Sequence, residues 1–141
     1  MKLKKVLMVL MATATIMTAP KMMVNAAEKP HKIRCTAYIA EDGDITADGS
    51  TVREGVIAGK RDWLGKTAII YSMEKDGSIG HQKGIFEFKD TGYGMKVKGS
   101  KKGAIQLGTS VDVYRNTLDR CYDWVGEYGD YVYIQIIDAE G

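Results

Sequence analysis

The sequence has few residues that commonly ligate metals, with two cysteines and two histidines in 141 residues. His31 and His81 have no partner at a spacing typical of a metal site, and Cys35 and Cys121 are not a close pair. No glycine-rich segment resembles a phosphate-binding loop. The sequence therefore predicts neither a metal site nor a cofactor.

Long hydrophobic runs are also scarce. One uncharged apolar run, from Val6 to Ala19, follows three lysines near the N-terminus, and the small residues of Val24-Asn25-Ala26 follow it. This pattern is typical of a secretory signal peptide over residues 1–26. The run is too short to cross a bilayer, which needs about 20 residues. We therefore expect a secreted or cell-wall-associated protein with no membrane anchor after cleavage.

Positive charge is not in excess once the N-terminal segment is set aside. Four of the 20 Lys and Arg lie within residues 1–26, which leaves 16 against 18 Asp and Glu, a net charge of about −2. A nearly neutral domain is not typical of nucleic-acid binding. One basic run, Lys96, Lys98, Lys101 and Lys102, indicates either a solvated loop or contact with an anionic polymer such as cell wall.

Proline is rare as well, and no low-complexity linker divides the chain. We therefore expect one domain over residues 33–141, preceded by a flexible lead-in at 27–32. The many Gly, Val, Ile and Tyr residues favour strands over a helix bundle. Short apolar runs bounded by Gly, Asp or Ser predict strands at about 33–40, 55–58, 67–72, 84–89, 110–114 and 130–137.

A single helix is predicted from about 117 to 127, with Asn116 as its N-cap and Asp119 three residues on. Its apolar residues recur at a spacing of three or four, namely Leu118, Cys121, Tyr122, Val125 and Tyr128.

A weak internal repeat indicates a closed, two-fold architecture. Residues 64–71 and 107–114 share Leu, Gly and Tyr at equivalent positions, and both are predicted to run from a turn into a strand. Closure of a sheet would leave no exposed edge strands.

The two cysteines have two possible states in an exported protein. A Cys35–Cys121 disulfide would stabilise the fold by about 4 kcal/mol in the chain-entropy model. Alternatively, both residues are buried thiols that pack as small apolar side chains. The sequence leaves both alternatives open.

The candidate functional residues lie at strand ends and on one strand face. Asp90 follows an apolar strand and precedes Thr91-Gly92, where glycine permits a sharp turn and close approach of a ligand. Asp112 lies within a Val-Asp-Val strand, while Thr36 and Tyr38 share one face of the first strand. Taken singly, Asp90 is equally typical of a turn, and Asp112 of a solvent-facing position.

With these residues the chain resembles the 3D-domain family, named for three aspartates, within the double-psi β-barrel group of RlpA-like proteins and expansins. The resemblance implies a mainly β fold, a six-stranded double-psi β-barrel with one or two short helices. The chain departs from the family pattern at Gly59-Lys60-Arg61 and in an insertion at 100–110. The matching segments, in order, are Thr36-Ala37-Tyr38, Thr46-Ala47-Asp48-Gly49, 56–58 through Asp62 to Leu64-Gly65, Asp90-Thr91-Gly92 and 111–114.

The resemblance implies a lytic transglycosylase that cleaves the β-1,4 bond between N-acetylmuramic acid and N-acetylglucosamine in peptidoglycan. A short exported domain without a recognisable wall-binding module is expected to act alone, as a monomer. By this interpretation Asp90 is the single acid and base, kept protonated near neutral pH by the apolar strand before it and by the charge of Asp112. Asp112 tunes the pKa of Asp90 and positions the substrate. Asp62 holds a turn by hydrogen bonds to backbone amides. Thr36 and Tyr38 contact the sugar.

Two other classes remain open. An expansin-like module would bind wall glycan in the same groove without cutting it. A retroviral-type aspartic protease also carries Asp-Thr-Gly after an apolar strand, but it would need a homodimer here, and the apolar-apolar-Gly-Arg element that normally follows is absent from the sequence.

Overall fold

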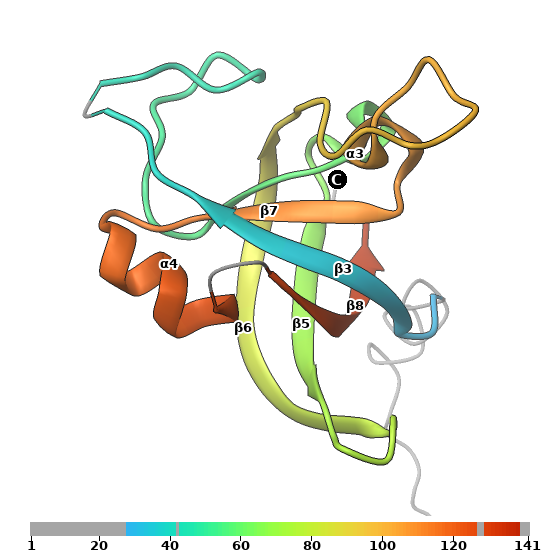
Figure 1. Ribbon diagram of the computed structural model, residues 1–141. Helices are drawn as coiled ribbons and strands as arrows, with labels where there is room; N and C mark the ends of the chain where they lie inside the picture. Colours follow the sequence, from blue (N-terminus) through green and yellow to red (C-terminus); the bar gives the residue numbers. More distant parts are fainter. Residues whose placement is uncertain (1–27, 42, 127–128, 139–141) are drawn as a thin grey trace, which may run out of the picture.

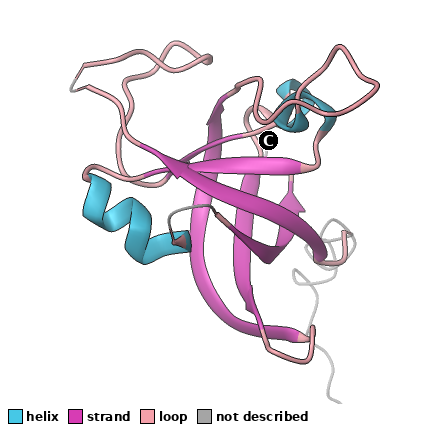
Figure 2. Cartoon of the chain, viewed as in Figure 1, coloured by secondary structure: helices cyan, strands magenta, loops and turns pink. Residues whose placement is uncertain are grey.

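The computed structural model describes residues 28–41, 43–126 and 129–138, and the predicted signal peptide at 1–26 and Tyr128 lie outside them. The described chain is mainly β (Figure 2). It contains two α-helices, α3 (Ala104–Leu107) and α4 (Leu118–Val125), and a 3-10 turn, η1 (Arg61–Trp63). Its six strands are β3 (His31–Tyr38), β4 (Val56–Ala58), β5 (Thr67–Met73), β6 (Ile79–Asp90), β7 (Ser110–Tyr114) and β8 (Asp130–Ile137).

Each strand is hydrogen bonded to two others. The order is β3-β7-β4-β6-β5-β8, and β8 pairs in turn with β3. The β3–β7 and β4–β6 pairs are parallel, whereas the remaining pairs are antiparallel. In Figure 1, β3 and β7 cross in front of the long strands β5 and β6. The crossed arrangement brings β7 between two strands that precede it by more than fifty residues.

The core lies where the inward faces of these strands meet. Alternate residues point to opposite faces of a strand, so the buried side chains follow a period of two. The fully or nearly fully buried residues include Ile33, Cys35, Ile57, Ala68, Ile70, Phe86, Phe88, Val111, Val113, Val132, Ile134 and Ile136. By the same alternation, the outward face of β3 carries Lys32, Arg34, Thr36 and Tyr38.

Several predicted bounds are confirmed and others are not. The strands at 110–114 and 130–137 have the predicted bounds. β3 begins at His31, within the expected flexible lead-in, because His31 and Lys32 pair with Ile134 and Tyr133 of β8. β6 begins at Ile79, five residues before the predicted start, because it continues along β5 to Met73.

The helices also differ in part from prediction. α4 occupies most of the predicted helix, but its N-cap is Thr117, whose Oγ1 accepts a hydrogen bond from the Arg120 N–H at 3.2 Å. The prediction of Asn116 as the N-cap is wrong, because the Asn116 side chain instead accepts a hydrogen bond from the Arg120 guanidinium at 3.3 Å. The four-residue helix α3 was not predicted, since so short a segment shows no helical periodicity. No helix in the described ranges is long and apolar enough to span a membrane.

The repeated segments adopt similar local structure. Gly65 and Gly108 both have positive φ, +89° and +81°, and each is followed within two residues by a strand, β5 or β7. A turn made by glycine in the left-handed region therefore precedes the strand in both copies.

Gly94 packs against α3 more closely than any side chain allows. A Cβ at Gly94 would lie 2.5 Å from the Ile105 backbone nitrogen, whereas one at Gly99, in the same loop, would meet no atom within 4 Å. Both glycines have positive φ, +86° and +81°. We expect Gly94→Ala to lower the free energy of unfolding by about 1–3 kcal/mol more than Gly99→Ala, the usual cost of overpacking. Urea denaturation of the two variants measures this difference, and equal losses would contradict the packing role of Gly94.

Candidate functional site

Two of the predicted aspartates lie in one row of residues across the sheet. Thr36 on β3 pairs with Asp112 on β7, and Asp112 pairs with Ala58 on β4. Ala58 pairs on its other side with Asp90 on β6. Adjacent strands are about 4.8 Å apart, so the backbones of Asp90 and Asp112 are separated by about 10 Å with β4 between them.

A β-bulge turns Asp90 to the outward face. Phe88 pairs with buried Ile57, while Asp90 pairs with the next residue, Ala58, which leaves Lys89 as an extra residue in β6. In a regular strand Asp90 would share the inward face of Phe88, because the two are separated by two residues. The bulge therefore removes Asp90 from the core and places it on the face of Asp112.

The Asp90 carboxylate accepts three hydrogen bonds. The Tyr38 hydroxyl donates to Oδ2 at 3.0 Å, and the backbone N–H groups of Ala47 and Thr91 donate to Oδ1, each at 3.0 Å. Hydrogen bonds of this kind stabilise an ionised carboxylate. Burial and the negative charge of Asp90 raise the pKa of Tyr38, so its phenol stays protonated and donates.

The turn that supplies the Ala47 N–H is itself fixed to β6. The Asp48 carboxylate accepts hydrogen bonds from the Ser50 N–H and the Thr46 hydroxyl, at 2.9 and 2.8 Å. The other oxygen of this carboxylate lies 3.3 Å from Lys89 Nζ. The backbone N–H of Asp48 donates a hydrogen bond to the Lys89 carbonyl at 3.0 Å. The hydrogen bonds from Ser50, followed by those from Thr46 and Lys89, lower the pKa of Asp48. The sequence predicted this turn but not the hydrogen bond that the Ala47 N–H donates to Asp90, because every residue type except proline has a backbone N–H.

Asp112 has a different environment from Asp90. Burial raises its pKa to about 6, and the negative charge of Asp90 acts in the same direction. The Thr36 hydroxyl donates to Asp112 Oδ1 at 2.8 Å and opposes the rise. Asp112 therefore exchanges its proton close to neutral pH. The sequence-based hypothesis gave a raised pKa to Asp90 and a tuning role to Asp112, whereas in the structure it is Asp112 whose pKa is raised.

Asp62 does not join the two carboxyl groups in these contacts. It lies on η1, its side chain is 79% exposed, and its ionic contact is with Lys60 at 3.8 Å. In the described ranges it accepts no hydrogen bond from a backbone amide, so the predicted turn-holding role is wrong. An exposed, weakly paired carboxylate of this kind contributes little to stability.

Thr91 and Gly92 lie directly after Asp90 as expected. Thr91 contributes its N–H to the carboxylate. A Cβ on Gly92 would lie 3.4 Å from Ile105 Cδ1, at the edge of ordinary van der Waals contact, so packing against α3 does not require glycine at this position.

The cysteines are free thiols, and the disulfide alternative is not realised. Cys35 is fully buried and accepts a hydrogen bond from Trp124 Nε1 at 3.4 Å, while Cys121 is buried on α4. Burial raises the pKa of Cys35 to about 12. Both residues therefore act as core side chains, and Cys35 is a poor nucleophile at neutral pH.

The row of residues offers acid–base chemistry. Its members are the Asp112 carboxyl group with its pKa of about 6, the Asp90 carboxylate with its three donors, and the hydroxyls of Thr36 and Tyr38. Within the described ranges no three His, Cys, Asp or Glu side chains gather as metal ligands. A carboxyl group that titrates near neutral pH, with a second carboxyl group one strand away, is typical of an acid and its charge-stabilising partner.

The buried Asp112 carboxylate has a predictable effect on stability. Its folded pKa of about 6 exceeds the ordinary 3.8, so its ionisation opposes folding and stability falls as pH rises from about 4 through 6. We expect Asp112→Asn to be more stable than the unmodified protein at pH 7.5, by on the order of 1–3 kcal/mol, and to lose this gain at pH 4. Urea unfolding at both pH values measures the gain, with Asp62→Asn as the exposed control. A gain independent of pH would contradict the assignment.

Comparison with family models, with curated proteins and with solved structures finds no match to this chain.

Proposed function

We propose that the protein is an exported lytic transglycosylase that cleaves the β-1,4 bond between N-acetylmuramic acid and N-acetylglucosamine in peptidoglycan. One observation carries the proposal: the row of paired residues holds Asp112, with a pKa of about 6, one strand away from the hydrogen-bonded carboxylate of Asp90. Cleavage of a glycosidic bond needs such a proton donor beside a stabilised negative charge.

We infer that the strand ring is a double-psi β-barrel. Two parallel pairs, β3–β7 and β4–β6, are joined through the β4–β7 pair, and the two similar segments each lead into a strand of the ring. These features agree with an architecture made of two related halves. The candidate carboxyl groups lie on β6 and β7, one in each parallel pair.

Asp112 is the acid and base of the proposed reaction. Its proton passes to the glycosidic oxygen as the bond from that oxygen to the anomeric carbon breaks. The 6-hydroxyl oxygen of the muramic sugar then bonds to the anomeric carbon, and its proton returns to Asp112. The products are a free 4-hydroxyl and a 1,6-anhydro sugar, so no water is consumed and the carboxyl group is regenerated.

Asp90 stabilises the positive charge that develops on the sugar in this scheme. Its three hydrogen bonds fix the orientation of the carboxylate, so it needs no movement during the reaction. Its charge also helps Asp112 keep a proton. The proposal therefore retains the predicted pair of residues and exchanges their roles.

The products of wall digestion test the function and the roles together. Mass spectrometry of soluble fragments from purified peptidoglycan should show anhydro-muropeptides with the unmodified protein and with Asp62→Asn. We expect Asp112→Asn to lower their rate of release by at least about 100-fold, the usual minimum for loss of a general acid. Asp112→Asn is expected to be stable at neutral pH, so unfolding would not explain its loss.

Other outcomes separate the alternatives. Full activity of Asp112→Asn with loss in Asp90→Asn would restore Asp90 as the acid. Wall binding by every variant, with no fragment from any of them, would overturn catalysis and favour the expansin-like binding module.

The neighbours of Asp112 should move its pKa in opposite directions. Thr36→Val removes the donor to the carboxylate and should raise the pKa above about 6, while Asp90→Asn removes a negative charge and should lower it. Titration of the Asp112 carboxyl carbon by NMR measures both shifts without requiring activity. In the unmodified enzyme, cleavage should fall as pH rises above about 6. Shifts of the same sign in the two variants would contradict the proposed coupling.

A further inference from the structure

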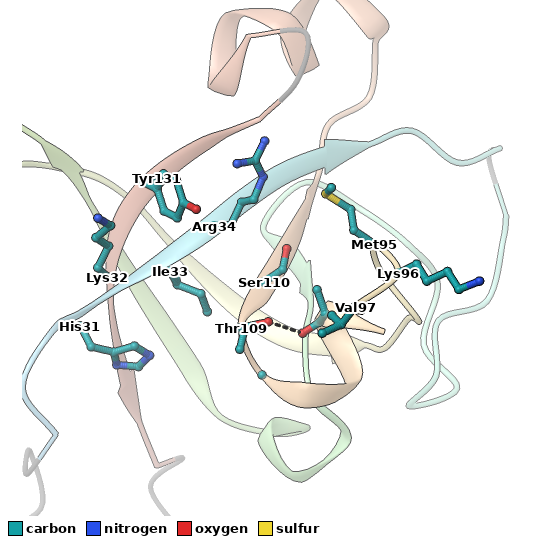
Figure 3. A pocket seen from close by; sticks show the side chains of 12 residues that line it. His31, Lys32, Ile33, Arg34, Met95, Lys96, Val97, Thr109, Ser110 and Tyr131 are labelled. Carbon is teal, nitrogen blue, oxygen red and sulfur yellow. Dashed lines mark hydrogen bonds between the residues drawn. The ribbon is translucent and has the colours of Figure 1, made fainter. Parts of the chain in front are cut away.

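A separate cavity of about 550 Å³ lies beside the first half of β3. Its walls come from residues 31–34 of β3, residues 95–97 of the loop after Asp90, the turn between α3 and β7, and Tyr131 of β8. Figure 3 shows the side chains of Lys32, Arg34 and Tyr131 on the same side of β3. A cavity of this size holds a small organic ligand or a short peptide segment.

The cavity walls carry one sign of charge. His31, Lys32, Arg34 and Lys96 line the cavity, and none of its lining residues is Asp or Glu. Lys32 and Lys96 take part in no ion pair in the described parts of the chain. Low-dielectric walls that carry one sign of charge concentrate ligands of the opposite sign.

An aromatic ring orders the two cations on β3. Lys32 Nζ lies 4.8 Å and Arg34 Cζ 5.5 Å from the centre of the Tyr131 ring, which is 42% exposed. Such contacts hold flexible cationic side chains in place while the ring remains available for packing. The planar guanidinium of arginine matches a carboxylate, with two parallel hydrogen bonds. The remaining wall includes apolar Ile33, Val97 and Ala104, so the cavity suits an anion with apolar parts.

The cavity lies along the same strand face as the candidate carboxyl groups. Lys32, Arg34, Thr36 and Tyr38 alternate on the outward face of β3, where Thr36 contacts Asp112 and Tyr38 contacts Asp90. At about 3.3 Å per residue, Arg34 and Tyr38 are about 13 Å apart along the strand. Thr36 is about 7 Å from Arg34 along the strand, so a peptide branch of about two to four extended residues reaches from the carboxyl row into the cavity.

We propose that this cavity binds the carboxylates of the peptide stems carried by the glycan, an assignment of ligand that rests on the proposed function. The small volume and the partly apolar lining favour a short acidic peptide over an extended phosphate polymer, which would need a long groove. Lys98, Lys101 and Lys102 do not line the cavity, and Lys96 extends away from β3 in Figure 3. The cations that bind the stem are Lys32 and Arg34.

Calorimetric titration with the tripeptide L-Ala-γ-D-Glu-L-Lys tests the site directly. We expect Lys32→Gln and Arg34→Lys each to weaken binding by about 5-fold or more. Arg34→Lys keeps the charge but lacks the planar guanidinium that donates two parallel hydrogen bonds to a carboxylate. The control Lys75→Gln removes the same charge from an exposed position outside the cavity and should change binding less than 2-fold. No tripeptide binding by the unmodified protein, or equal weakening by Lys75→Gln, would overturn the proposal.

Two further measurements identify the ligand and separate this inference from the proposed function. Competition by poly(glycerol phosphate) at lower concentration than the tripeptide would overturn the assignment to peptide carboxylates. Tripeptide binding that depends on Lys32 and Arg34, without release of wall fragments, would support the site and reject catalysis. Cleavage of stem-free and stem-bearing strands at equal rates, with no tripeptide binding, would reject the site and leave catalysis standing.

Discussion

The pairing of the short strand β4 between β6 and β7 is the constraint on which the candidate site depends. All three residues of β4 are buried, and Ile57 pairs with Phe88 on one side and with Val113 on the other. Ile57, Phe88 and Val113 belong to one core cluster, and a shift of β4 by one residue would turn Ile57 away from it, so this packing favours the observed register. The register then determines that Ala58 lies between Asp90 and Asp112, so core packing sets the geometry of the carboxyl groups.

The two aspartates of the row have different surroundings. Asp90 ends its strand at a turn, where backbone N–H groups are not used by the sheet and donate to its carboxylate. Asp112 lies in the middle of β7, where neighbouring strands exclude water and Thr36 is its hydroxyl partner. Burial raises the pKa of Asp112, while backbone donors fix the Asp90 carboxylate one strand away, and such a division of roles suits acid–base chemistry.

β3 links the proposed catalytic row to the cationic cavity. One face of this strand carries the hydroxyls that contact both aspartates and, farther back, the cations that lie over Tyr131. Because β3 is held on both sides by β7 and β8, these side chains keep a fixed spacing. A rigid strand of this kind positions two binding regions more accurately than a loop does.

The sequence by itself determined the mainly β fold, the strands at 110–114 and 130–137, and the choice of Asp90 and Asp112, because apolar alternation and turn residues are local signals. The tertiary structure alone decided that the pKa of Asp112 is raised, since its burial comes from strands distant in sequence. It also supplied the bulge at Lys89 and the Ala47 N–H, which reaches Asp90 across 43 residues. Strand register and backbone hydrogen-bond donors cannot be read from residue types, so only the assembled strands determine them.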